Sequence, residues 1–149
     1  ISEKKGYKHY FYGSSEETLN KLKNNLLKKY PKLKIVGIYS PPFRNLSVEE
    51  DKEVVDNINS SGADFVWVAL GAPKQEMWMY NHKDKIKPLM IGVGAAFDFI
   101  AGNIKRAPKW MQKLNLEWLY RLFQEPKRLF KRYWHSNTRF IWHAIIRGK

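Results

Sequence analysis

The chain has 149 residues, of which 44% are hydrophobic, so it is long and apolar enough to form a folded core. It contains no cysteine, which excludes disulfides, thiolate chemistry and zinc sites with cysteine ligands. The formal net charge is +13, and residues 105–149 carry most of it, with twelve lysines and arginines against two glutamates. Since no stretch approaches the roughly 20 apolar residues that a membrane span needs, we expect a protein that does not cross a bilayer.

The first 104 residues predict strands that alternate with helices. The predicted strands are 8–12, 34–39, 65–70 and 88–93. Ser-x-x-Glu patterns at Ser14 and Ser47 predict capping boxes that open helices ending near residues 29 and 60. Pro73 favours the first turn of a third helix. Because each strand is followed by a helix, we predict an α/β fold with a Rossmann-like parallel sheet of about four strands, within a first domain of residues 1–107.

From Pro108 onward the pattern predicts helices alone, over 108–123 and 126–146, as a second domain of residues 108–149. This part holds four of the six tryptophans among its many lysines and arginines. Basic and aromatic side chains together suit a helix at a membrane interface, where each cation contributes about 1 kcal/mol near anionic lipid. The same mixture also suits single-stranded nucleic acid or a solvated helix face, and the pattern alone leaves these alternatives open.

Two loops at the ends of predicted strands are candidates for ligand binding. Gly71-Ala72-Pro73-Lys74-Gln75-Glu76 joins a buried strand to a helix, so backbone amides there favour an anionic group such as a diphosphate. Gln75 and Glu76 are placed to hydrogen-bond a sugar or base hydroxyl. The alternative is an ordinary helix start in which Glu76 only offsets the helix dipole.

The second loop is Gly92-Val93-Gly94-Ala95-Ala96-Phe97-Asp98, which follows the last predicted strand. Asp98 is placed to accept a hydrogen bond from a nucleoside or sugar hydroxyl, and its alternative role is a helix cap. Ligands of open α/β sheets bind at the carboxyl ends of the strands, where both loops lie. The four histidines and the acidic residues show no metal-ligand spacing, so we predict neither a metal nor a cofactor.

Four motifs in order resemble those of the WecG/TagA/CpsF glycosyltransferase family. They are Gly-Ala-Pro-Lys-Gln-Glu, Gly-Val-Gly-Ala-Ala-Phe-Asp-Phe-Ile-Ala-Gly, Arg-Ala-Pro-Lys-Trp and Leu-Glu-Trp-Leu-Tyr-Arg-Leu-Phe-Gln-Glu-Pro-Lys-Arg. The resemblance implies an inverting transfer of N-acetylmannosamine, or a related sugar, from a UDP donor. The acceptor would be polyprenyl-diphosphate-linked N-acetylglucosamine, in the biosynthesis of teichoic acid or another surface polysaccharide.

The resemblance also implies roles for individual residues. Catalytic roles would fall to Gln75, Arg121, Arg128 and Arg132, with Lys131 as an alternative to Arg132 for contacting the diphosphates. Contacts to the UDP-sugar would come from Gly13, Gly71, Pro73, Glu76, Gly94, Phe97 and Asp98. The helical appendage would face an anionic membrane, which places the protein in the cytoplasm as a peripheral protein at the inner face of the bacterial membrane, with no nucleic-acid partner. Homo-oligomer formation stays open.

Members of this family carry a further N-terminal segment with the aspartate thought to act as the general base, and the sequence given begins at Ile1 without it. An inverting transfer needs a base for the acceptor hydroxyl and positive groups for the leaving diphosphate. We therefore expect this chain alone to bind UDP weakly and not to turn over. A non-catalytic relative that binds nucleotide or membrane, or a basic nucleic-acid-binding domain, is the alternative.

Overall fold

The computed structural model describes residues 1–124, 126, 134 and 142. It divides into two compact units, Ile1–Lys105 and Arg106–Lys149.

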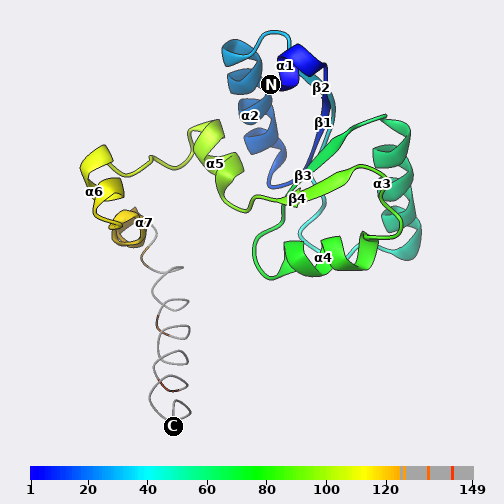
Figure 1. The fold of residues 1–149 in the computed structure, drawn as a ribbon. Helices are drawn as coiled ribbons and strands as arrows, with labels where there is room; N and C mark the ends of the chain where they lie inside the picture. The colour runs from blue at the N-terminus through cyan, green and yellow to red at the C-terminus, as the bar shows by residue number, and fades with distance from the viewer. Residues whose placement is uncertain (125, 127–133, 135–141, 143–149) are drawn as a thin grey trace. The chain divides into compact units, whose positions relative to one another are not determined.

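The first unit is built on a four-stranded sheet in the order β2-β1-β3-β4 (Figure 1). Its strands are β1 (Lys8–Gly13), β2 (Lys34–Tyr39), β3 (Phe65–Ala69) and β4 (Leu89–Gly92). Every pairing is parallel, with Phe11 opposite Trp67 and Trp67 opposite Ile91. The predicted α/β fold with a parallel sheet of four strands is therefore confirmed.

Helices pack on both faces of this sheet because successive strand residues point to opposite sides. The helices of the first unit are α1 (Ser2–Lys5), α2 (Glu16–Lys29), α3 (Val48–Ser60), α4 (Lys74–His82) and α5 (Ala96–Ala101). Tyr10 and Tyr12 of β1 join the core under α3 and α4. Phe11, between them, joins the second core under α2 and α5. The short helix α1 was not anticipated from the sequence.

The two predicted capping boxes have different outcomes. Ser47 caps α3 with the predicted box, since its side chain accepts from Glu50 N and Glu50 accepts from Ser47 N. Arg44 also pairs with Glu50, and this hydrogen bond together with the capping contact lowers the pKa of Glu50 to about 2. The box predicted at Ser14 is wrong, because Ser14 has φ +62° and belongs to the turn. Ser15 has the extended backbone of an N-cap and accepts from Thr18 N instead.

A buried histidine joins the two helices on one face of the sheet. His82 of α4 has its Nδ1 2.7 Å from Trp78 O and its Nε2 2.9 Å from Asp51 Oδ2 of α3. The His82 side chain is only 6% exposed. The Asp51→Ala variant would leave a buried ring nitrogen without its partner, so we expect it to lower the free energy of unfolding by about 2 kcal/mol.

Urea denaturation of the Asp51→Ala variant measures this effect. The matched control is Asp56→Ala, which removes the exposed Lys52–Asp56 ion pair on the same helix. Exposed pairs contribute little, so this control should change stability by less than about 0.5 kcal/mol. Equal losses of unfolding free energy in the two variants would contradict the view that the buried contact between His82 and Asp51 stabilises the packing of α4 on α3.

In the second unit, α6 (Lys109–Lys113) and α7 (Glu117–Gln124) replace the single helix predicted over 108–123. The single helix is wrong because Asn115 adopts φ +57°, a left-handed conformation that ends α6. Leu116 N then donates to Met111 O at 2.8 Å. The helix predicted over 126–146 lies outside the described residues. Among those described, no helix has the length and apolar character needed to cross a membrane.

Candidate functional site

The carboxyl edge of the sheet brings the ends of β1, β3 and β4 together. Ser14 N donates to Ala69 O at 3.0 Å, which joins the loop after β1 to the end of β3. Val93 N donates to Val68 O at 2.9 Å, which joins the loop after β4 to the same strand. The two loops singled out in the sequence are thus neighbours, at the edge where parallel sheets bind ligands.

Gln75 connects these two loops directly. Its Oε1 accepts from Gly94 N at 3.1 Å, and its Nε2 donates to Glu76 Oε1 at 2.8 Å. The side chain packs beside Gly92, where an added Cβ would lie 3.2 Å from Gln75 Nε2. Gln75 is 9% exposed, so it holds the β4–α5 loop against the start of α4. This geometry supports a positioning role, while its predicted contact with the sugar stays a prediction.

Three of the predicted contact residues are glycines with positive φ, but their surroundings differ. Gly13 has φ +113°, and a Cβ there would lie 2.5 Å from Ala69 O of the neighbouring strand. Gly71 has φ +79° with nothing within 4 Å of an added Cβ. Gly94 has φ +51° and lies over Gln75. Close packing of β1 on β3 therefore requires a glycine at position 13, whereas open space lies beside Gly71.

The remaining predicted contacts are partly exposed and partly buried. Pro73 and Glu76 are exposed at the start of α4, and Pro73 is the N-cap residue of that helix. Phe97 is 2% exposed and packs edge-on against Phe11, with ring centroids 5.5 Å apart. We assign the Phe97 ring to the core, and a contact between it and a ligand stays a prediction.

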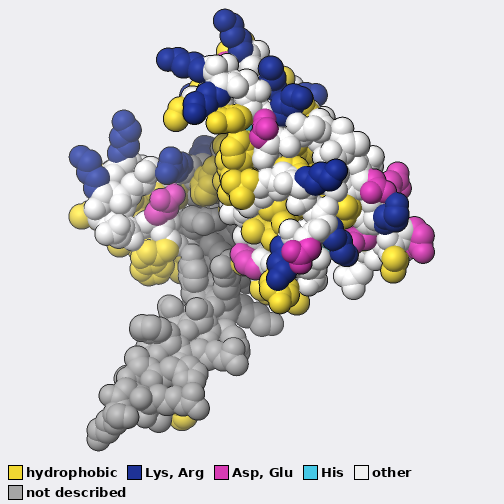
Figure 2. Space-filling model, turned by 45° about the vertical axis from the view of Figure 1, so that its right-hand side comes forward, with side chains coloured by type: hydrophobic (Ala, Val, Ile, Leu, Met, Phe, Trp, Pro, Cys, Tyr) yellow, Lys and Arg dark blue, Asp and Glu magenta, His cyan; other side chains and the backbone are white. Residues whose placement is uncertain are grey.

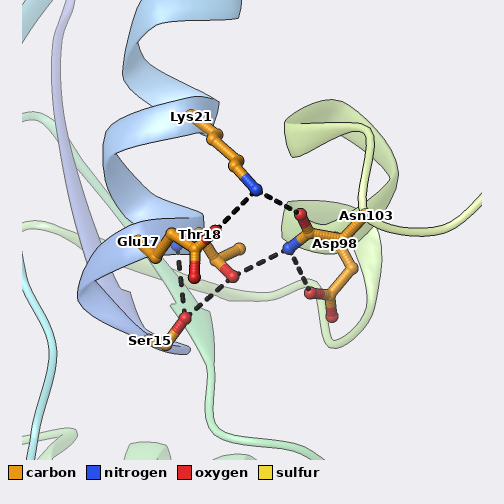
Figure 3. A network of polar contacts seen from close by, with 6 residues as sticks. All are labelled: Ser15, Glu17, Thr18, Lys21, Asp98 and Asn103. Atoms are coloured by element: carbon orange, nitrogen blue, oxygen red, sulfur yellow. Dashed lines mark hydrogen bonds and ion pairs between the residues drawn. The ribbon is translucent and has the colours of Figure 1, made fainter.

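Asp98 belongs to a polar network that joins α2 to the end of α5 (Figure 3). Asn103 Nδ2 donates to Asp98 Oδ1 at 3.3 Å and to Thr18 Oγ1 at 2.9 Å. Ser15 Oγ donates to Thr18 Oγ1 at 2.9 Å. Lys21 forms an ion pair with Glu17 at 2.7 Å and reaches Asn103 Oδ1 at 3.5 Å. The carboxylate is therefore held by an amide and keeps further capacity to accept hydrogen bonds.

Asn103 was missed in the sequence, although one local signal was present. It follows Gly102, which ends α5 with φ +82°, and such a glycine marks the end of a helix. The Asn103→Ala variant removes hydrogen bonds to both Asp98 and Thr18, so we expect a loss of about 1 kcal/mol in unfolding free energy. Thermal unfolding followed by circular dichroism measures it. An unchanged midpoint would show that the network does not stabilise the α2–α5 junction.

The side chains of the three arginines predicted to contact diphosphates lie outside the described residues. Arg121 lies in α7, and its side chain is outside the described residues. Arg128 and Arg132, together with Lys131, also lie outside them. Their contacts with diphosphates therefore stay predictions.

The described edge combines turn amides with carboxylates. Glu76 and Asp98 are acceptors, while the amides at the start of α4 are donors at the positive end of a nine-residue helix. Such a set suits a ligand that carries both hydroxyls and an anionic group. No cluster of three or more metal-binding side chains occurs within the described part of the chain. The expectation that the protein needs no cofactor stays a prediction.

Comparison with known proteins identifies the family. The family model described as "Glycosyl transferase WecG/TagA/CpsF family" matches residues 1–149 of the chain. The chain belongs to the WecG/TagA/CpsF glycosyltransferase family. The resemblance inferred from the four motifs is therefore confirmed, and in this WecG/TagA/CpsF chain the first two motifs occupy the loops that Gln75 joins.

Two curated relatives have the same name, N-acetylglucosaminyldiphosphoundecaprenol N-acetyl-beta-D-mannosaminyltransferase. The protein from Bacillus subtilis (strain 168) is 37% identical over 129 residues, which cover 86% of this chain. The protein from Bacillus spizizenii (strain ATCC 23059 / NRRL B-14472 / W23) is 33% identical over 128 residues, which cover 85% of this chain. The WecG/TagA/CpsF chain described here spans 48% of the length of each relative.

Proposed function

We propose that this chain holds the sugar-nucleotide donor in a transfer of N-acetylmannosamine to polyprenyl-diphosphate-linked N-acetylglucosamine. The observation that carries the proposal is the 3.1 Å hydrogen bond from Gly94 N to Gln75 Oε1. This hydrogen bond joins the loops that contain two of the family motifs, which supports a single site formed by both. The names of the two relatives supply the sugar and the lipid-linked acceptor. The UDP part of the donor is what the resemblance to the family implies, and the amides and carboxylates of this edge suit it.

A UDP-sugar offers the groups that this edge can bind. Its diphosphate suits the turn amides at the N-terminus of α4, because that end of a helix carries partial positive charge. Its ribose and hexose hydroxyls suit the carboxylates of Glu76 and Asp98, which accept hydrogen bonds. Asp98 is oriented by Asn103, so it enters the complex with little further ordering.

The second unit supports a role for this protein at a membrane surface. Trp110 is 60% exposed, Leu114 is 62% exposed and Phe123 is 75% exposed. Lys109 and Lys113 lie in the same short helix as Trp110. Exposed aromatic rings beside cations suit the headgroup region of an anionic bilayer, where a polyprenyl diphosphate would present its sugar. We therefore infer a peripheral protein at the inner face of the bacterial membrane.

A chimeric enzyme tests the proposed function. The matched 129 residues of the Bacillus subtilis relative would be exchanged for the corresponding part of this chain. We expect the chimera to transfer N-acetylmannosamine from its UDP donor to a short-chain prenyl-diphosphate N-acetylglucosamine. The Asp98→Ala variant should reduce this transfer, because it removes a carboxylate that we assign to the donor. Mass spectrometry of the lipid product measures the transfer.

The matched control for the chimera is Asp84→Ala. Asp84 is an exposed acidic residue just after α4. A folded chimera that transfers no sugar, or one in which Asp98→Ala and Asp84→Ala have equal effects, would contradict the proposal.

A further inference from the structure

The connection between β2 and α3 lies at the same edge of the sheet as the two proposed donor loops. β2 runs parallel to β1, so residues 40–47 leave the sheet at its carboxyl edge. Ser40 Oγ donates to Ser14 O at 2.7 Å, and Ser14 N donates to Ala69 O at the end of β3. The β2–α3 connection is therefore joined, through the turn after β1, to the strand that leads into α4.

Phe43 lies near the middle of this connection and is 97% exposed. Pro41 and Pro42 precede it, and each proline ring fixes the φ angle of its own residue. Arg44 follows it and donates to both carboxylate oxygens of Glu50, with 2.7 Å between Nη1 and Oε2. Glu50 belongs to the capping box of α3. The ring of Phe43 is thus presented to solvent by an ordered segment, so a ligand that binds it loses little further conformational entropy.

The strand order places this ring at one end of the proposed donor site (Figure 1). β3 leads into the start of α4, where we place the diphosphate, and β4 leads into the loop that carries Asp98. β2 lies on the opposite side, with β1 between it and β3. Since neighbouring strands are about 4.8 Å apart, the ends of β2 and β3 are about 10 Å apart. The connections that carry Phe43 and Asp98 therefore leave the sheet on opposite sides of the diphosphate position.

A UDP-sugar has its base and ribose on one side of the diphosphate and its hexose on the other. With the diphosphate at the start of α4 and the hexose toward Asp98, the uridine extends toward β1 and β2. Nucleobases bind proteins by stacking on exposed aromatic rings. Phe97, the aromatic residue among the predicted contacts, is 2% exposed and has no free face for a base. Phe43 offers such a face on the side where the uridine would lie.

We propose that the ring of Phe43 stacks on the uracil of the donor, so that the donor lies along the carboxyl edge with its base at the β2–α3 connection and its hexose at Asp98. This inference rests on the proposed function, because it assigns one end of the same donor. Phe43 lies outside the four family motifs, so it adds both a contact residue and an orientation to them.

Insertion of Phe43 into a bilayer fits its surroundings less well. The first turn of α3 carries Glu49, Glu50 and Asp51, and Arg44 is already paired with Glu50. Figure 2 shows side chains of both charges mixed on the surface where α3 lies. Anionic bilayers attract surfaces with an excess of cations, so an acidic helix start beside Phe43 opposes insertion.

Binding of two diphosphates to the full chain tests the proposal. UDP and methyl diphosphate carry the same anionic group, but only UDP carries a base. NMR titration gives the dissociation constant of each ligand, even where binding is weak. We expect the Phe43→Ala variant to bind UDP at least about fivefold more weakly than the unchanged chain, with the affinity for methyl diphosphate unaltered. The Phe43→Trp variant should keep the affinity for UDP, because it keeps an aromatic face.

The matched control is Tyr80→Ala, which removes another exposed aromatic ring, in the second half of α4. It should change neither affinity. Equal UDP affinity with and without the Phe43 ring, or equal weakening of both ligands in Phe43→Ala, would overturn the inference and leave the proposed donor site in place. Failure of both ligands to bind the unchanged chain would instead overturn the proposed function, and this inference with it.

Discussion

The Gln75→Ala variant is expected to raise the KM of the chimeric enzyme for its UDP-sugar donor by about 5- to 150-fold. The change leaves Gly94 N without the acceptor that holds the β4–α5 loop, and an unpaired, partly buried amide costs about 1–3 kcal/mol. Because the loss of this hydrogen bond changes the shape of the donor site, we expect KM for the donor to rise by a larger factor than kcat falls. Steady-state kinetics with varied donor concentration measure the two constants.

Asn59→Ala is the matched control for Gln75. Asn59 also joins two segments through its amide, donating to Lys85 O and accepting from Lys87 N, each at 2.8 Å. This bond pair lies before β4 rather than after it, so its loss should affect stability without raising KM for the donor. Equal changes in KM for the two variants would show that Gln75 acts only through general stability.

The Gly13→Ala variant is expected to lower the free energy of unfolding by about 3 kcal/mol or more. Two costs add at this position, namely the left-handed backbone at φ +113° and the approach of the new methyl group to Ala69 O. Gly71→Ala is the control, because φ is also positive there but nothing lies within 4 Å. We expect it to cost about 1–2 kcal/mol.

Urea denaturation compares the two glycine variants directly. A larger loss at Gly13 supports the view that this glycine is needed for the packing of β1 on β3. A larger loss at Gly71 would contradict that view, because it would indicate a close contact that the structure does not contain.

Much of the fold follows from the local pattern of the sequence. The apolar runs over 65–70 and 88–93, each ended by a glycine, correctly predict two parallel strands because they read as strands covered on both faces. Ser47 and Glu50 correctly predict a helix start, since a capping box needs only neighbours within four residues. The failure at Ser14 has a local cause too, because either of two adjacent serines can cap a helix.

The contacts that build the site could not be predicted in this way. Gln75 reaches Gly94 across 19 positions, and Asn103 reaches Thr18 across 85. Such pairs depend on the register of β3 against β4 and on the packing of α2 against α5. Residue type and spacing therefore located the two loops, but they did not reveal which side chain joins them or which one orients Asp98.

Hydrogen exchange measured with and without UDP-N-acetylmannosamine shows whether these two loops form one donor site. We expect slowed exchange in the peptides over 70–77 and 93–99 together, and loss of both effects in the Gln75→Ala variant. Protection of only one loop, or protection elsewhere with both loops unchanged, would contradict it.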